Sequence, residues 1–346
     1  MTIISEENVS WKGDIWIDDI WTAEDKAKAM EELHALEHQQ HNDKQQLQQQ
    51  QRQEVFDQFR RNASTNWNSF YDKNQTNFFK DRHYLHKAFP AEFGWLYVDA
   101  NACEEVKNNS HQHHSILDNN ITVAEIGCGV GNAILPLLEQ HTELIHKKQT
   151  RSSDDDNVQI PQLQIHCLDF APTAIHLLKL DPRFQSAEKE GRATAHVYDL
   201  SSTHPSQVNL ENTADVAILL FCLSAIGPHP SAALSRASRH VIDILKPGGT
   251  LVIRDYGRLD EAQMKLSRGE KKIDENFYRK GDGTGCYYFE IQDLKDLFVN
   301  DQNGLELLEL EYVSNSSYIS LMLNMLHRIS YRMLCSHHFF LLQLHF

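Results

Sequence analysis

Between residues 121 and 256 short apolar runs alternate with amphipathic stretches, and this alternation restricts the possible folds more than any other feature of the sequence. Strands that alternate with helices form a parallel sheet, because each crossover helix returns the chain to the same end of the sheet. We therefore predict a doubly wound α/β domain with helices on both faces. The predicted strands are 121–126, 163–169, 193–198 and 215–223, with a turn and strand at 245–257, and the predicted helices are 132–139, 172–180 and 232–245.

Composition sets the size and surroundings of this domain. Of 346 residues, 41% are hydrophobic, which is enough for a sizeable core. The formal net charge of −15 disfavours a protein that coats nucleic acid by charge alone. No run of about 18 apolar residues occurs, so we expect a soluble protein without membrane association. The polar, acidic beginning of the chain is unlike a targeting peptide, so we expect a cytoplasmic location, with the nucleus as the alternative.

Two polar segments stand apart from the alternating pattern. Residues 1–62 are acidic and then glutamine-rich, which predicts a flexible or loosely helical arm, with a polar helix over 24–37 that is best explained as a solvated spacer. Residues 147–159 contain serines and an aspartate run, which predicts a surface loop inserted into the domain. The six cysteines are far apart and never form C-x-x-C, so we expect reduced thiols and no metal site.

A glycine-rich turn follows the first predicted strand. The segment V-A-E-I-G-C-G-V-G-N at 123–132 contains Gly127, Gly129 and Gly131. Glycines let the backbone approach a ligand closely and turn into a helix whose N-terminus favours electron-rich groups. A dinucleotide fingerprint needs glycine at 132, where this chain has Asn132, so NAD fits poorly. Glu125 is better explained by a ligand with a positive charge or an amine.

Two further predicted strands end in acids, Asp169 and Asp199. The carboxyl ends of strands in a doubly wound sheet line one crevice, so we expect both to converge with Glu125. The first can bind ribose hydroxyls and the second can accept from an adenine amine. Each acid alone is as well explained by a helix cap or a loop charge, but the three together favour a nucleoside ligand.

This pattern resembles the S-adenosylmethionine (SAM)-dependent methyltransferases. Residues 125–131 resemble their first motif, Asp169 resembles their ribose-binding acid, and Asp199 with Leu200 resembles their adenine-contacting pair. The spacing from Glu125 to Asp169 is longer than usual, and the insertion at 147–159 accounts for it. The resemblance implies a Rossmann-like class I sheet and SAM as the cofactor.

Three longer blocks narrow the resemblance to the tRNA 3-methylcytidine methyltransferases, which modify cytidine 32 of the anticodon loop. They lie at 67–85, at 219–228 with 254–257, and at 276–289, within a similarity that spans about residues 63–313. The D-I-W-I-D-D-I-W segment at 14–21 is similar to the tryptophan box of the threonine-tRNA subgroup. The resemblance implies N3-methylcytidine formation in threonine or arginine tRNAs, and as partners the tRNA anticodon loop and an aminoacyl-tRNA synthetase or other tRNA-binding helper.

The first motif and the resemblance together assign cofactor contact to ten residues. They are Trp67, Tyr71, Glu125, Gly127, Gly129, Gly131, Asp169, Asp199, Leu200 and Leu220. Trp67 and Tyr71 share a helix face, and they either close over an adenosyl ligand or plug the sheet. For Leu220, an ordinary core role is equally compatible with contact to adenine.

Basic residues alternate with aromatic ones at 78–87. Aromatic faces stack on unpaired bases while cations bind phosphates, although a helix with a charged outer face and a packed inner face is the alternative. A second basic stretch between Lys265 and Lys280 has a local charge of +3, and the glycines that follow make 265–289 a candidate mobile lid. We predict RNA contact for Lys80, Arg82, His83, Arg254, Lys271, Lys272 and Arg279.

The chemistry of cytosine suggests one catalytic candidate. Unpaired N3 carries a lone pair at neutral pH, so methyl transfer needs no base, and catalysis comes mainly from alignment and electrostatics. The product is cationic, so a carboxylate could stabilise the developing charge. Asp255 is our candidate, with Arg254 or Tyr256 as orienting partners, and a structural salt bridge is the alternative.

The sequence departs from the family after Val313. The tail at 314–346 forms either a helix with a substitute edge strand at 339–346 or a segment foreign to the fold, and a missing strand would expose an apolar edge. We divide the chain into the arm at 1–62, an RNA- and cofactor-capping segment at 63–115, the methyltransferase domain at 116–313 and the tail.

Two functions other than tRNA methylation are alternatives for this sequence. The first is a catalytically silent RNA-binding or scaffold protein that keeps the methyltransferase fold. The second is a methyltransferase for a protein or small molecule, which the basic and aromatic residues at 78–87 disfavour.

Overall fold

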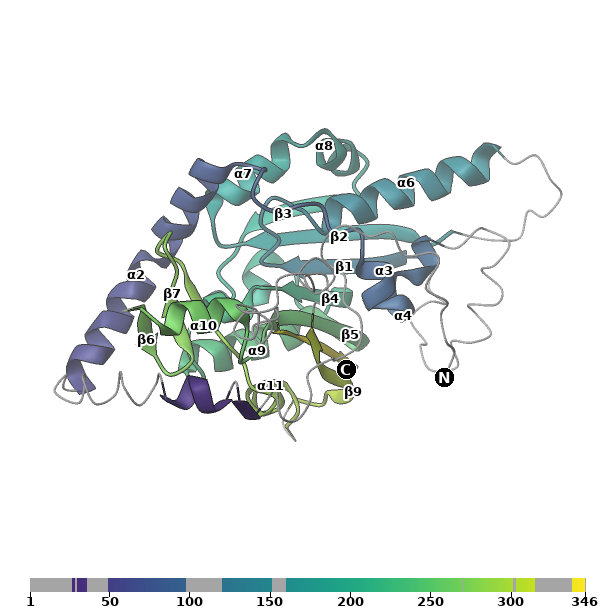
Figure 1. The fold of residues 1–346 in the computed structure, drawn as a ribbon. Coiled ribbons are helices and arrows are strands. Elements are labelled where there is room, and N and C mark those ends of the chain that lie inside the picture. The colour runs from purple at the N-terminus through teal and green to yellow at the C-terminus, as the bar shows by residue number, and fades with distance from the viewer. Residues whose placement is uncertain are drawn as a thin grey trace, which may run out of the picture.

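A seven-stranded sheet forms the centre of the molecule (Figure 1). The computed structural model describes residues 27, 28, 30–35, 49–97, 120–150, 160–269, 271–300, 303–314 and 338–345. The strand order is β3-β2-β1-β4-β5-β10-β9. The strands are β1 (Asn120–Ile126), β2 (Gln162–Asp169), β3 (Ala193–Val197), β4 (Ala214–Leu220), β5 (Leu245–Tyr256), β9 (Glu306–Ser314) and β10 (His338–His345).

The five strands from β1 to β5 pair in parallel, as the alternating sequence predicts. The connecting helices begin at sequence signals for helix starts: Pro172 begins α7, Asp181 caps α8, and Ser231 caps α9. The helices of the sheet domain are α6 (Ile134–Thr150), α7 (Pro172–Leu180), α8 (Pro182–Lys189), α9 (Ala232–Ile244) and α11 (Ile291–Phe298).

Helices cover both faces of the sheet. Successive side chains of a strand point to opposite faces, and in β4 they enter two different clusters. Ile218 and Leu220 pack in the cluster that contains residues of α6, α7 and α8, whereas Ala217 and Leu219 pack in the cluster that contains residues of α9 and α11. The predicted doubly wound class I arrangement is therefore confirmed.

Helix α2 (Gln49–Asn74) lies outside the sheet and beside α7 (Figure 1). It passes through the predicted boundary at 62, so residues 49–62 take the helical form of the predicted arm and continue into the next segment. Phe59 packs edge-on against Phe277, with ring centroids 5.2 Å apart. This contact fixes α2 against a second, three-stranded sheet of β6 (Lys272–Asp274), β7 (Phe277–Arg279) and β8 (Gly285–Tyr287).

The small sheet occupies most of the predicted lid at 265–289. Tyr278 and Cys286 are fully buried, and an added Cβ on Gly285 would lie 2.5 Å from both Phe59 and Phe277. Gly285 thus serves close packing against α2 rather than backbone freedom. Whether the segment moves stays a prediction.

The polar helix predicted at 24–37 is observed at 27, 28 and 30–35, but it is not a solvated spacer. Leu33 is completely buried against Leu259 and Met264, and Glu32 forms a 2.7 Å ion pair with Arg268. These partners lie on and beside α10 (Glu261–Ser267). The tryptophan box at 14–21 lies outside the described residues.

The C-terminal strand differs most from its prediction. β10 exists, but it is not an edge strand: it pairs antiparallel with β5 on one side and with β9 on the other. Its insertion leaves β9 at the edge. The apolar run Phe339–Leu342 suits such an interior position better than an edge, because both neighbouring strands provide backbone partners.

Several boundaries also differ from the predicted ones. Helix α6 continues to Thr150, so the predicted inserted loop begins as helix, and 151–159 lie outside the described residues. Strand β4 ends at Leu220 because Phe221 has a left-handed backbone with φ of 58°. Two short helices, α3 (Leu85–Ala88) and α4 (Pro90–Phe93), precede β1.

Two predictions, on membrane-spanning helices and on cysteine thiols, can be compared with the described part of the chain. None of its helices is both long and apolar enough to cross a bilayer. The four cysteines in the described ranges are free thiols.

Candidate cofactor and RNA site

A cavity of about 450 Å³ lies where β1, β2 and β4 end. Its volume is in the range of about 300–1,000 Å³ that is typical of small-molecule sites. Nine of the ten residues predicted to contact the cofactor line it: Trp67, Tyr71, Glu125, Gly127, Gly129, Asp169, Asp199, Leu200 and Leu220. The sheet provides the floor, and α2 provides the wall that contains the two aromatic residues.

The glycine turn follows β1 and requires glycine for steric reasons. Gly129 has φ of 56°, and an added Cβ would lie 2.7 Å from the hydroxyl oxygen of Tyr71. Gly131, the tenth predicted residue, serves packing instead: its Cβ would lie 2.5 Å from Leu178 of α7. The prediction that Gly131 contacts the cofactor is therefore replaced by a role in close helix packing.

Asp169 ties the end of β2 to the glycine turn. Its Oδ2 accepts from the backbone N–H of Gly129 at 2.8 Å, and its Oδ1 accepts from that of Ala171 at 2.9 Å. Burial raises the pKa of Asp169 to about 6, although both hydrogen bonds oppose the rise. Each carboxylate oxygen can accept a second hydrogen bond, so the side chain retains capacity for a ligand.

Asp199 both lines the cavity and organises the turn after β3. Its Oδ1 accepts from the backbone and hydroxyl of Ser201, at 2.9 and 2.7 Å, and its Oδ2 accepts from the hydroxyl of Ser202 at 2.6 Å. The loop role that we held open for this acid is thus observed together with the cavity position.

Glu125 is the least satisfied acid of the cavity. It is 3% exposed, and its Oε2 has no hydrogen-bond partner among the described residues. Burial raises its pKa to about 8, while the guanidinium of Arg82 opposes the rise and Asp169 adds to it. A buried acid without a partner is costly, and such groups are typical of sites where a ligand supplies the missing donor.

Arg82 belongs to the cavity wall rather than to the outer surface. Its guanidinium lies 4.8 Å from the ring centroid of Phe221, and Nη1 donates to the hydroxyl of Tyr84 at 3.4 Å. Arg82 and Glu125 both line the cavity, and the guanidinium opposes the rise in the pKa of Glu125. We therefore correct the predicted role of Arg82 as a phosphate contact.

The remaining predicted RNA residues fall into two groups. The basic side chains of one group are exposed or half-buried: Lys80, His83, Lys271, Lys272 and Arg279. Arg254 is only 3% exposed, with its guanidinium 4.7 Å from the ring centroid of Tyr84 and 5.8 Å from that of Phe221. Because two aromatic rings hold it in the interior, its burial is at odds with the predicted RNA contact of Arg254.

Asp255 lies beside the cavity and not in its described wall. It is completely buried, and it accepts from the backbone N–H groups of Ser224 at 3.0 Å and Tyr256 at 2.9 Å. Burial raises its pKa to about 6, and Lys280 opposes the rise. These contacts are backbone hydrogen bonds rather than the salt bridge that we gave as the alternative, and a catalytic role for Asp255 stays a prediction.

Several cavity residues were missed by the sequence analysis. Arg60 and Arg61 are exposed residues of α2 at the cavity, and the assumption of a flexible arm concealed them although they form a basic pair seven and six residues before Trp67. Tyr198 has a buried hydroxyl without a partner among the described residues. No sequence signal marks Phe221, because its left-handed backbone is visible only in the structure.

The geometry defines a class of protein. A parallel sheet with one antiparallel strand, a glycine turn after β1, and acids after β2 and β3 around one cavity define a class I SAM-dependent methyltransferase. In agreement, residues 124–251 match a family model described as a methyltransferase domain.

Comparison with curated proteins narrows the class to a family. The chain is 32% identical over 259 residues to tRNA N(3)-cytidine methyltransferase METTL2 of Xenopus tropicalis, which covers 70% of this chain and 69% of the relative. It is 33% identical over 272 residues to the METTL2 protein of Danio rerio, which covers 75% and 68%. It is also 32% identical over 243 residues to the tRNA(Thr) (cytosine(32)-N(3))-methyltransferase of Saccharomyces cerevisiae, which covers 69% of this chain and 32% of the relative. The chain belongs to the tRNA N(3)-cytidine methyltransferase family.

Proposed function

We propose that this enzyme transfers a methyl group from SAM to N3 of cytidine 32 in the anticodon loop of tRNA, with threonine tRNAs as the first expected substrates and arginine tRNAs as the second. The name of the yeast relative supports the nucleotide and the threonine tRNA. The observation that carries the proposal is the convergence of Glu125, Asp169 and Asp199 on one cavity.

The chemistry of the cavity fits the parts of SAM. The free lone pairs of Asp169 suit ribose hydroxyls, and the apolar side chains of Leu200 and Leu220 suit the faces of adenine. The orphaned Oε2 of Glu125 suits the ammonium group of the methionyl part, and the guanidinium of Arg82 suits its carboxylate. When bound, SAM supplies a methyl group on a positively charged sulfur.

The residues of this chain contribute alignment more than proton transfer. The N3 atom of an unpaired cytosine has an available lone pair, so no group of the protein needs to remove a proton before methyl transfer. Trp67 and Tyr71 close the α2 side of the cavity and exclude water from it. The target base must leave the stack of the anticodon loop to reach this space.

The cations around the cavity suit the RNA backbone. Arg60 and Arg61 lie on the exposed part of α2, and Lys80 and His83 are exposed next to the cavity residues Phe79 and Arg82. Phe78, which is 57% exposed, offers an aromatic face for an unpaired base. Single-stranded loops are commonly held by this combination of stacking and phosphate contacts.

We further propose that a synthetase or another tRNA-binding helper assists recognition, and that the enzyme acts in the cytoplasm. The support is indirect: the family resemblance implies the helper. Affinity purification of the tagged full chain from cells, before and after ribonuclease treatment, tests for a helper that remains bound without tRNA.

The decisive test of the proposed function is methyl transfer to a defined tRNA. Purified protein is incubated with SAM that carries a labelled methyl group and an unmodified threonine-tRNA transcript, and the label is mapped by nuclease digestion and mass spectrometry. We expect N3-methylcytidine at position 32 and no label in a matched transcript with uridine at that position.

Two results would contradict the proposal. Label at another nucleotide, or in protein, would show a different substrate. Binding of S-adenosylhomocysteine without transfer to any tRNA, even with the purified helper added, would favour the catalytically silent alternative.

A further inference from the structure

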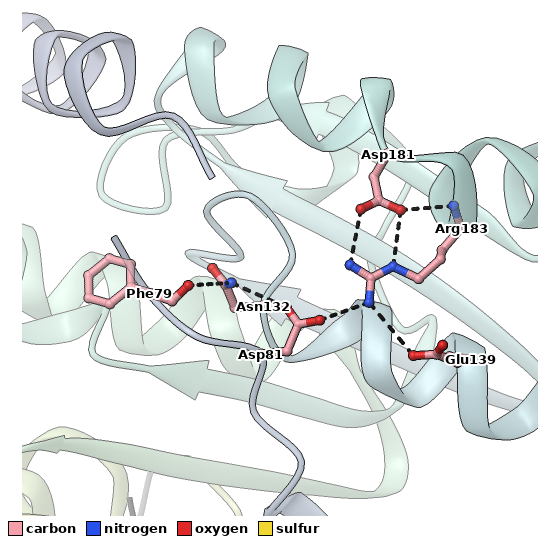
Figure 2. A network of polar contacts seen from close by, with 6 residues as sticks. All are labelled: Phe79, Asp81, Asn132, Glu139, Asp181 and Arg183. Carbon is pink, nitrogen blue, oxygen red and sulfur yellow. Dashed lines mark hydrogen bonds and ion pairs between the residues drawn. The ribbon is translucent and has the colours of Figure 1, made fainter. Parts of the chain in front are cut away.

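Residues 78–83, which we call the strap, connect α2 to α3 and present successive side chains to different surroundings. Phe79 and Arg82 line the cofactor cavity, whereas Lys80 and His83 are exposed. The side chain of Asp81 does neither: it points toward the start of α8 (Figure 2). One short segment therefore connects the cavity with the outer surface that carries Lys80 and His83.

The strap is bonded to the glycine turn through Asn132. The side-chain amide of Asn132 donates to the carbonyl of Phe79 at 3.0 Å and to Oδ1 of Asp81 at 3.4 Å. In return, the backbone N–H of Arg82 donates to the carbonyl of Asn132 at 2.7 Å. Asn132 also lines the cavity, so the attachment of the strap forms part of the wall of the ligand space.

The strap is bonded to the helices through Arg183. Nη1 of Arg183 lies 2.8 Å from Oδ2 of Asp81 and 3.7 Å from a carboxylate oxygen of Glu139 in α6. Nε and Nη2 donate to the two carboxylate oxygens of Asp181, at 3.1 and 3.0 Å (Figure 2).

This geometry makes the ion pair of Arg183 with Asp81 more than an ordinary surface contact. The bidentate bond to Asp181 fixes the guanidinium before it meets Asp81, and the side chains of Arg183 and Asp81 are only 33% and 30% exposed. Isolated exposed ion pairs contribute little, but oriented networks of this kind specify a geometry.

We propose that Asp81 is a positioning residue: its ion pair with Arg183 holds Arg82 in the cofactor cavity and Lys80 and His83 on the outer face, so that the cofactor and tRNA each strengthen the binding of the other. This inference rests on the proposed function, because it takes Lys80 and His83 as RNA contacts. A cofactor that binds Arg82 and an RNA that binds Lys80 both select the same arrangement of the strap. Coupling between two binding sites is reciprocal by thermodynamic necessity.

The test compares Asp81→Asn with a matched control, Glu188→Gln. The control also converts a carboxylate to an amide, and it removes the exposed 3.9 Å pair of Glu188 with Lys179 without touching the strap. The affinity for a threonine-tRNA transcript is measured by fluorescence anisotropy, without and with saturating S-adenosylhomocysteine. The reciprocal measurement is the affinity for S-adenosylhomocysteine without and with tRNA.

We expect the wild type and Glu188→Gln to bind tRNA at least about 5-fold more tightly when S-adenosylhomocysteine is present. In Asp81→Asn the ratio should fall to within about 2-fold of one, while the melting temperature changes little. Arg183→Gln, an independent variant of the same pair, should lose the coupling equally, and the double variant should lose no more than either single one.

A coupling ratio near one in the wild type, or an undiminished ratio in both Asp81→Asn and Arg183→Gln, would overturn the inference. If one variant fails to fold, the other decides. The methyl-transfer assay separates this failure from failure of the proposed function: transfer to cytidine 32 without coupling removes only the role of the strap, whereas absence of transfer removes the function.

Discussion

At the scale of single residues, the glycine turn illustrates how conformation and packing select the same amino acid. Gly129 has a left-handed backbone and no space for a Cβ beside Tyr71, whereas Gly191 has φ of 73° and open space around it. The two positions therefore separate the cost of backbone strain from the cost of altering the cavity.

We predict that Gly129→Ala and Gly191→Ala each lower the free energy of unfolding by about 1–2 kcal/mol, because both place an L-residue in the left-handed region. Only Gly129→Ala should also weaken the binding of S-adenosylhomocysteine. We expect the affinity to fall by about 10-fold or more, because the new Cβ displaces Tyr71 from the cavity wall. Thermal unfolding and isothermal titration measure the two effects. Equal affinities in the two variants would show that Tyr71 does not need its present position.

Glu125 gives the site a dependence on pH. Its pKa in the folded protein, about 8, exceeds its ordinary value of 4.5. Its contribution to stability is therefore fully present below about pH 4.5 and is lost as the pH rises through about 8. A ligand ammonium favours the ionised form, so ligand binding should release a proton near neutral pH.

We predict that S-adenosylhomocysteine binding at about pH 7 releases close to one proton per site, and that affinity rises up to about pH 8 and then levels off. Glu125→Gln should release almost none and should flatten this rise. Isothermal titration in buffers with different ionisation enthalpies counts the protons. Proton release that is unchanged in Glu125→Gln would assign the titration to another group.

At the scale of elements, β10 completes the sheet from the far end of the chain. Leu342 pairs with Ile253 of β5 and with Leu310 of β9, so its backbone lies between two strands. Proline is found in sheets at edges and bulges because it removes a backbone donor.

We therefore predict that Leu342→Pro abolishes cooperative unfolding or lowers the melting temperature by more than about 10 °C, since a lost ladder bond and strand distortion cost several kcal/mol. Leu342→Val is the control, because a β-branched residue suits a strand. Circular dichroism during heating compares them. A proline variant as stable as the control would mean that β10 is dispensable for the sheet.

The sequence predicted the regular elements better than the unusual ones. The limits of α7 agree at both ends, because Pro172 and a clear apolar period mark it. The convergence of Glu125, Asp169 and Asp199 was also predictable, since the ends of parallel strands meet at one edge. In contrast, the interior position of β10 depends on long-range pairing that no local pattern encodes.

In the site, too, the features that depend on long-range contacts were not predictable from the sequence. The ion pair of Arg183 with Asp81 joins residues 102 positions apart, so sequence spacing gave no sign of it. The sequence predicted RNA contact for Arg82 and Arg254, but aromatic neighbours contributed by other elements hold each of them inside.

At the scale of the whole molecule, an enzyme with a net charge of −15 must bind a polyanion through local cations. Lys80 lies beside the cavity. Lys147 lies near the far end of α6, about 20 Å from its start at a rise of 1.5 Å per residue. The two lysines therefore provide a matched comparison.

We predict that Lys80→Ala weakens tRNA binding and reduces the slope of log affinity against log salt concentration by about 0.7–0.9, the value for one lost phosphate contact. Lys147→Ala should leave the slope unchanged. Anisotropy titrations over a range of salt concentrations give both slopes. Equal slopes in the two variants would place the RNA elsewhere on the surface.

Isothermal titration of the full chain with S-adenosylhomocysteine tests most directly whether acids at three strand ends form one site for SAM. We predict one site per chain, with affinity at least about 10-fold weaker in Asp199→Asn, which keeps the shape of the side chain but changes its acceptors. Absence of binding to the wild type, or equal affinity in Asp199→Asn, would contradict this prediction.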